Sequence, residues 1–135
     1  MNVRIKALWN KMLRSGIPQT TGALYRPTDG LSYDDGDDDL LAGACCLGLL
    51  CELHRQDTGN GQWVESDGAV MYKCFDDKGT DMDSEVLPYP VQRWAGLTET
   101  NPSVQTDDGD TCQLGALNDA GVSFERIAGL ILKSL

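Results

Sequence analysis

Three cysteines and the only histidine of the chain lie close together, between Ala44 and Gly61. Thiolates and imidazole bind zinc, and a thiol beside an imidazole is a nucleophile with its base. The stretch therefore raises two chemistries, a metal site and Cys–His catalysis. A third interpretation is structural, in which the thiols only fill space in the core.

The spacing favours the structural interpretation if the stretch is helical, because helix residues turn by about 100° each. The leucines that then share a face with Cys46 are Leu49, Leu50 and Leu53. On such a face a free thiol behaves as a small hydrophobic side chain. We therefore predict that Cys46 packs in the core.

Only Cys51 and His54, at positions i and i+3, can approach each other on this helix. Zinc normally takes four ligands, and Cys74 and Cys112 are the cysteines left to complete such a site. No C-x-x-C spacing is present to assemble a metal site. We expect no metal or other cofactor, and a thiol- or metal-dependent hydrolase using Cys51 and His54 is kept as an alternative.

Acidic residues are concentrated in three runs, at positions 34–39, 76–85 and 107–110. The chain has 21 acidic and 11 basic residues and a formal net charge of −10. Neither of the two longer runs has the D-x-D-x-D-G spacing with a distal glutamate of an EF-hand. The runs are either solvated loops or a negative face for a basic protein partner. Direct nucleic-acid binding is disfavoured, because the phosphates would be repelled.

The partner-binding hypothesis uses carboxylates of the first two runs and two aromatic side chains. The carboxylates belong to Asp34, Asp35, Asp37, Asp38, Asp39, Asp76, Asp77, Asp81, Asp83 and Glu85, and the aromatic side chains to Tyr89 and Trp94. This predicts a non-enzymatic accessory protein that binds a basic protein through its acidic loops. A small-ligand site between the predicted hairpin and the cysteine-containing helix is a further alternative.

Length and composition predict one domain. The chain has 135 residues, of which 41% are hydrophobic, enough for a single core. No run of 18 apolar residues occurs, and charges interrupt the apolar positions of the first 13 residues, unlike a secretory signal. Five cysteines, two of them adjacent, make a poor disulfide framework. We expect a cytoplasmic protein with free thiols and no membrane association; the sequence does not specify its oligomeric state.

In the first half of the chain, apolar spacing predicts a helix over 5–13 that ends near Gly16. A long loop follows over 20–39, with one short strand at 23–25. A second helix is expected over 40–55, with one of Asp37 to Asp39 capping its first turn. The runs 62–65 and 70–75 predict a β-hairpin around Asp67-Gly68.

In the second half, residues 76–85 are predicted as a polar loop and Pro90 as the start of a short helix that stops at Gly96. Val104 begins another strand. Asp110 and Gln113 have the spacing of a capping box for a helix that ends at Gly121. A final helix follows, with Ser123 as its N-cap.

Together these elements predict an α+β fold. We expect one compact domain, residues 1–135, with four to five helices, a small antiparallel hairpin or sheet and long acidic loops. The side chains assigned to the core are those of Trp9, Cys46, Leu49, Leu53, Phe124, Ile127 and Ile131.

Several stretches resemble a family of short proteins carried by bacteriophages, plasmids and other mobile elements, and a mobile gene cassette is a related setting. The resembling segments are 13–16 (LRSG) with Gln19 and Gly22, 45–53 (CCLGLLCEL), 94–97 (WAGL) and 117–128, from LND to IA. The family has no established activity, so the resemblance implies a genetic setting and not a chemistry. The segment 33–39 is more acidic than the family pattern, which makes any role of that loop particular to this chain.

Overall fold

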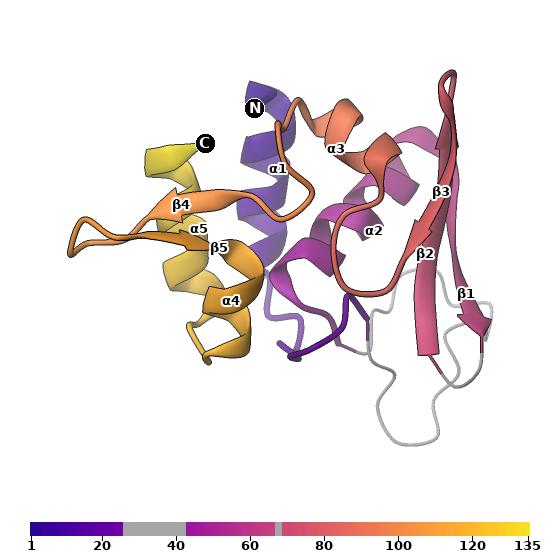
Figure 1. Cartoon of the computed structure of the whole chain (residues 1–135). Helices are drawn as coiled ribbons and strands as arrows, with labels where there is room; N and C mark the ends of the chain where they lie inside the picture. Colours follow the sequence, from indigo (N-terminus) through magenta and orange to yellow (C-terminus); the bar gives the residue numbers. More distant parts are fainter. Residues whose placement is uncertain (26–42, 67–68) are drawn as a thin grey trace.

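The computed structural model describes residues 1–25, 43–66 and 69–135, and statements about structure refer to these residues (Figure 1). The helices are α1 (Val3–Leu13), α2 (Cys46–Thr58), α3 (Tyr89–Ala95), α4 (Leu114–Asp119) and α5 (Phe124–Ser134). The strands are β1 (Gly61–Ser66), β2 (Ala69–Asp76), β3 (Gly79–Asp83), β4 (Ser103–Gln105) and β5 (Thr111–Gln113). Strands β1, β2 and β3 form an antiparallel sheet, and β4 and β5 form a hairpin. The predicted α+β fold is confirmed.

Helix α2 lies at the centre of the molecule. The three-stranded sheet and α3 lie on one side of it, and α1, α4 and α5 lie on the other (Figure 1). Every residue from Cys46 to His54 is buried. A helix that is covered on all sides must be apolar around most of its circumference, and the sequence of α2 meets this requirement.

The start of α2 differs from the prediction. The helix begins at Cys46, and its N-cap is Cys45, whose sulfur accepts a hydrogen bond from the Gly48 amide at 3.4 Å. Capping by Asp37 to Asp39 is therefore wrong. Ala44 is extended because its carbonyl accepts from Thr20 and its amide donates to Pro18, which prevents the helix from starting earlier.

The hairpin of β1 and β2 is confirmed, and β2 alternates buried Val70, Tyr72 and Cys74 with exposed or half-buried residues. The prediction of a loop over 76–85 is wrong in part, because β3 occupies 79–83 and pairs with β2. The short strand predicted over 23–25 is reduced to a single bridge between Tyr25 and Ala44.

The C-terminal elements follow the prediction except at one cap. Helix α3 ends at Gly96 in the left-handed conformation, and Ser123 Oγ accepts from the Arg126 amide at 3.3 Å to cap α5. The predicted capping box of Asp110 and Gln113 is wrong. Residues 111–113 pair with β4 instead, and α4 starts at Leu114 without a side-chain cap.

The seven side chains assigned to the core are buried, with at most 8% of any of them exposed, and belong to Trp9, Cys46, Leu49, Leu53, Phe124, Ile127 and Ile131. One buried polar side chain, that of Asn118, connects several segments. Its Oδ1 accepts from the Cys46 amide at 3.1 Å and from Gln19 Nε2 at 2.9 Å, and its Nδ2 donates to the Thr20 carbonyl at 2.7 Å. These bonds join α4, the start of α2 and the segment that leads away from α1.

Two helical glycines allow a paired test of the packing around α2. An alanine Cβ at position 48 would lie 1.8 Å from the Leu24 carbonyl oxygen, whereas one at position 129, in α5, would meet no atom within 4 Å. We predict that Gly48→Ala lowers the free energy of unfolding by about 3 kcal/mol or more. Gly129→Ala is expected to raise it by about 0.5 to 1 kcal/mol. Urea unfolding of both variants measures the difference, and similar effects at the two positions would contradict the close approach of Leu24 to α2.

Candidate functional site

The cysteines form no exposed reactive centre. Cys45, Cys46, Cys51 and Cys74 are buried, Cys112 is half-buried, and all five are free thiols. Burial raises the pKa of the Cys46 and Cys51 thiols well above the usual value, and that of Cys74 to about 12. A catalytic thiol needs the opposite shift, toward the thiolate at neutral pH.

His54 is buried and hydrogen-bonded to a phenol. Its Nδ1 lies 2.7 Å from the Tyr72 hydroxyl, and its ring meets the rings of Tyr72 and Trp94 edge-on. Desolvation lowers the pKa of His54 to about 4, against the opposing influence of Asp57 and Asp76. The imidazole is therefore neutral at physiological pH.

The predicted Cys51–His54 pair is not assembled as a catalytic pair. In the parts of the chain that the structure describes, no hydrogen bond joins Cys51 to His54, and no cluster of three or more His, Cys, Asp or Glu side chains is placed to hold a metal ion. The hydrolase alternative therefore lacks both an accessible thiol and a free base beside it.

Three of the predicted partner-binding carboxylates serve the fold. Asp76 forms a bidentate ion pair with Arg93, with distances of 2.6 and 3.0 Å, and this pairing lowers the pKa of Asp76 to about 2. Asp81 accepts from the amide of Tyr89, the first residue of α3, at 2.9 Å. Asp83 accepts from the amides of Glu85 and Val86, at 2.9 and 3.2 Å. The first pair joins β2 to α3, and the bonds of Asp81 and Asp83 hold the segment between β3 and α3.

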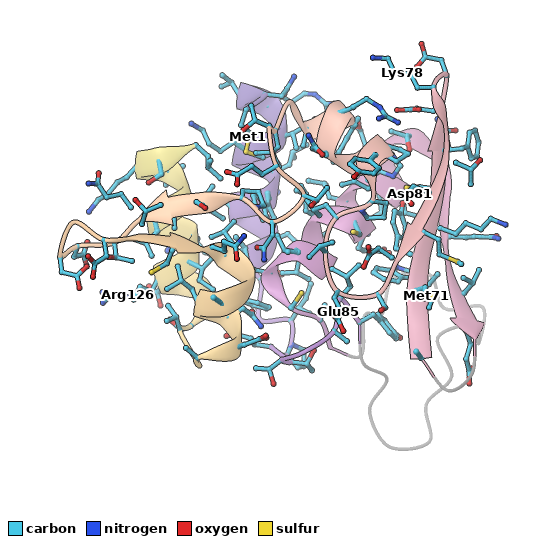
Figure 2. All side chains as sticks on the ribbon, in the orientation of Figure 1. Met1, Met71, Lys78, Asp81, Glu85 and Arg126 are labelled. Atoms are coloured by element: carbon cyan, nitrogen blue, oxygen red, sulfur yellow. The ribbon has the colours of Figure 1, made fainter. Side chains whose placement is uncertain are left out.

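The other predicted residues of this region differ in exposure. Asp77, Glu85 and Tyr89 are exposed, and neither carboxylate forms a side-chain hydrogen bond or an ion pair among the described residues, although Asp77 lies within electrostatic reach of Arg93. Trp94 is half-buried, and its Nε1 donates to Asp57 at 3.0 Å. In Figure 2 Lys78 lies at the tip of the β2–β3 hairpin, Asp81 lies further along β3, and Glu85 follows on the next loop. The predicted residues 34–39 lie outside the described residues.

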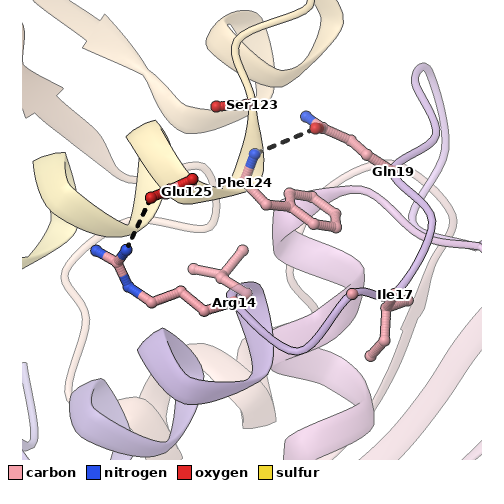
Figure 3. A pocket seen from close by; sticks show the side chains of 8 residues that line it. Arg14, Ile17, Gln19, Ser123, Phe124 and Glu125 are labelled. Atoms are coloured by element: carbon pink, nitrogen blue, oxygen red, sulfur yellow. Dashed lines mark hydrogen bonds and ion pairs between the residues drawn. The ribbon is translucent and has the colours of Figure 1, made fainter.

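A cavity of about 510 Å³ lies where the end of α1 meets the start of α5 (Figure 3). Its lining residues are Leu13, Arg14, Gly16, Ile17, Gln19, Ser123, Phe124 and Glu125. Gln19 Oε1 accepts from the Phe124 amide at 3.2 Å, and Arg14 pairs with Glu125 at 3.8 Å. The polar groups of this cavity are thus occupied with one another.

A second cavity, of about 370 Å³, lies between the end of α2, the β2–β3 turn and α3. Its lining residues are His54, Thr58, Asn60, Phe75, Asp76, Asp77, Lys78, Pro90, Arg93 and Trp94. The cavity borders the cysteine-containing helix, as the small-ligand alternative expected, but it lies at the β2–β3 turn and α3 and not at the predicted hairpin of 62–65 and 70–75. We refer to it below as the His54 cavity.

Sequence reasoning missed Tyr72 and Arg93. Their partners, His54 and Asp76, are 18 and 17 positions away in sequence, so no local spacing reveals the pairs. One usable signal was present: the alternation of β2 places Tyr72, Cys74 and Asp76 on the same face of the strand.

A family model described as "Domain of unknown function (DUF8296)" matches residues 1–135, and the chain belongs to this family. No curated protein and no solved structure matches the chain. The mobile-element setting implied by the sequence resemblance stays a prediction. Among the described residues, no helix is long and apolar enough to cross a lipid bilayer.

The buried imidazole predicts a pH dependence of stability. The folded pKa of His54, about 4, lies below the value near 6.5 of an unfolded chain, so the unfolded state takes up the proton first. The stabilisation is present above pH 6.5 and is lost as the pH falls toward 4. We expect the free energy of unfolding of the wild type to fall by about 3 kcal/mol more than that of His54→Phe between pH 7 and pH 4. Urea titrations at several pH values measure this difference, and parallel curves would contradict the burial of His54.

Proposed function

We propose that this member of the DUF8296 family is a non-enzymatic protein that binds a basic protein partner through its acidic surface. The observation that carries the proposal is that arginine side chains of the chain are already paired with its own carboxylates. Every arginine in the described ranges forms an ion pair within the chain: Arg4 with Asp57, Arg14 with Glu125, Arg55 with Glu52, Arg93 with Asp76, and Arg126 with Asp107.

The internal ion pairs leave an excess of carboxylates for a partner. The formal net charge is −10, and the five described arginines and Lys133 are already in ion pairs, so many carboxylates have no cation of the chain beside them. A surface of this kind attracts basic proteins and accelerates their association, and the attraction weakens with salt. The absence of an accessible thiol beside His54 favours binding over thiol catalysis.

Asp77, Glu85 and Tyr89 are the described residues best suited to contact such a partner. Both carboxylates lack a hydrogen-bond or ion-pair partner among the described residues and can accept from lysine or arginine, and 58% of Tyr89 is exposed. Asp81 accepts from the Tyr89 amide and so anchors the backbone that carries the phenol. The apolar stem of a partner lysine or arginine would lie across the phenol ring, with its charge on a carboxylate.

The remaining parts of the proposal rest on the sequence. Asp34, Asp35, Asp37, Asp38 and Asp39 add five negative charges and are included on charge alone. The setting of a mobile element rests on the resemblance of the segments 13–22, 45–53, 94–97 and 117–128.

A decalysine peptide tests the role of the described carboxylates. We predict that Asp77→Asn with Glu85→Gln weakens its binding about three- to tenfold at low salt, since two exposed ion pairs are lost. The matched control is Glu65→Gln with Glu99→Gln, which removes the same charge from two other exposed glutamates and should change the dissociation constant less than twofold. Fluorescence anisotropy at several salt concentrations measures both.

Two outcomes would contradict the proposal. Equal weakening in the two double variants would mean that only bulk charge acts, without a binding face near Tyr89. Absence of decalysine binding at low salt would contradict recognition of a basic partner altogether.

A further inference from the structure

The His54 cavity has the size and composition of a small-molecule site. Its volume of about 370 Å³ falls within the range of about 300 to 1,000 Å³ typical of ligand pockets. Apolar walls come from Phe75, Pro90 and Trp94, and half of the Phe75 side chain is exposed. Such walls suit a planar ring, which packs on aromatic faces and edges.

One nitrogen of His54 is left for a ligand. The residue is 98% buried, and its Nδ1 is occupied by Tyr72, but its Nε2 has no partner among the described residues. Nε2 is accessible to water, so an acceptor atom of a ligand in the adjoining cavity would take the place of a water molecule there.

The Tyr72 hydroxyl fixes which nitrogen carries the proton. This phenol is fully buried and has no hydrogen-bond partner besides His54 in the described part of the chain. Its hydrogen is satisfied only if the O–H donates to Nδ1, and the proton of the neutral imidazole is then on Nε2. His54 therefore offers the cavity a hydrogen-bond donor, which calls for an acceptor such as a carbonyl oxygen.

A second polar side chain complements this donor. The carboxamide of Asn60 lines the same cavity and has no partner in the ranges that the structure describes. It can accept from an N–H of the ligand through Oδ1. A ligand that meets both residues thus has an acceptor and a donor, the combination that an amide or lactam provides.

The charges around the cavity cancel. Asp76 is paired with Arg93, and the neighbouring Asp77 and Lys78 carry one charge of each sign. The lining therefore favours neither a cation nor an anion.

We propose that the His54 cavity binds a small uncharged molecule with a planar ring and an amide group, whose carbonyl accepts from His54 and whose N–H donates to Asn60. This site differs from the proposed contact with a basic protein in its chemistry, because it uses hydrogen bonds inside a cavity, although Asp77 borders both.

Three probes of the same shape test the proposal: benzamide, benzoate and benzylamine. We expect benzamide to shift the NMR signals of the single histidine and of the Trp94 indole saturably at millimolar concentrations, and the two charged probes to bind at least fivefold more weakly. Long-range ¹H–¹⁵N spectra of the free protein should show the proton on Nε2 of His54.

Variants assign the binding to the cavity. His54→Phe keeps an aromatic ring but removes the donor, and Asn60→Ala removes the acceptor; each should weaken benzamide binding about tenfold, as followed on the Trp94 indole signal. Arg14→Gln, in the cavity of Figure 3, is the control and should leave binding unchanged. Asn60→Ala keeps the test decisive if His54→Phe does not fold.

Three results would overturn the proposal. They are the absence of a saturable benzamide shift, equal affinity for the three probes, and a proton on Nδ1 in the free protein. Benzamide binding that persists unchanged in Asn60→Ala would place the probe elsewhere and would also overturn it.

Discussion

The hydrogen bonds of the buried Asn118 carboxamide connect parts of the chain that are far apart in sequence. Asn118 bonds to Gln19, Thr20 and Cys46, while Gln19 also bonds to the Val122 carbonyl and the Phe124 amide. The beginnings of α2 and α5 are thereby fixed against the same segment. Because Asn118 is fully buried, loss of one of its partners would leave a buried polar atom unsatisfied, so these bonds act as a unit.

The central position of α2 imposes a second requirement on polar side chains. A helix enclosed on all sides buries its polar residues, and each then needs a partner from another element or from its own next turn. Glu52 meets this need through Arg55, Gln56 and the Trp63 indole. His54 is bonded to Tyr72 through Nδ1, and its Nε2, which has no protein partner among the described residues, distinguishes the His54 cavity from the one beside Gln19.

The sequence was sufficient for elements with strong local signals. The apolar stripe of α1, the cap at Ser123 and the alternation within β2 are local patterns, and they gave the right element types. It was insufficient where pairing with a distant segment decides the outcome. Residues 111–113 form a strand because β4 lies beside them, and α2 starts late because Ala44 pairs with segments around Gln19 and Tyr25.

The same limit applies to the candidate site. The helical periodicity indicated that Cys46 faces leucines. A helical wheel uses only local sequence, so it could not show that Cys51 and His54 are also enclosed, by the sheet and α3 on the other side of α2. The roles of Asp76, Asp81 and Asp83 were also out of reach. Their partners belong to α3 and the segment before it, so a run of acids that looks free in the sequence is largely engaged in the fold.

Because four thiols are buried, the rate at which they are chemically modified reports how often the core opens. Reagents that attack thiolates reach Cys45, Cys46, Cys51 and Cys74 only when the core separates, whereas the half-buried Cys112 stays within easier reach. We therefore expect Cys112 to be modified early and the four buried cysteines to be modified late. The late events depend on how often the surroundings of α2 come apart, and the early one on motion of the β4–β5 hairpin alone.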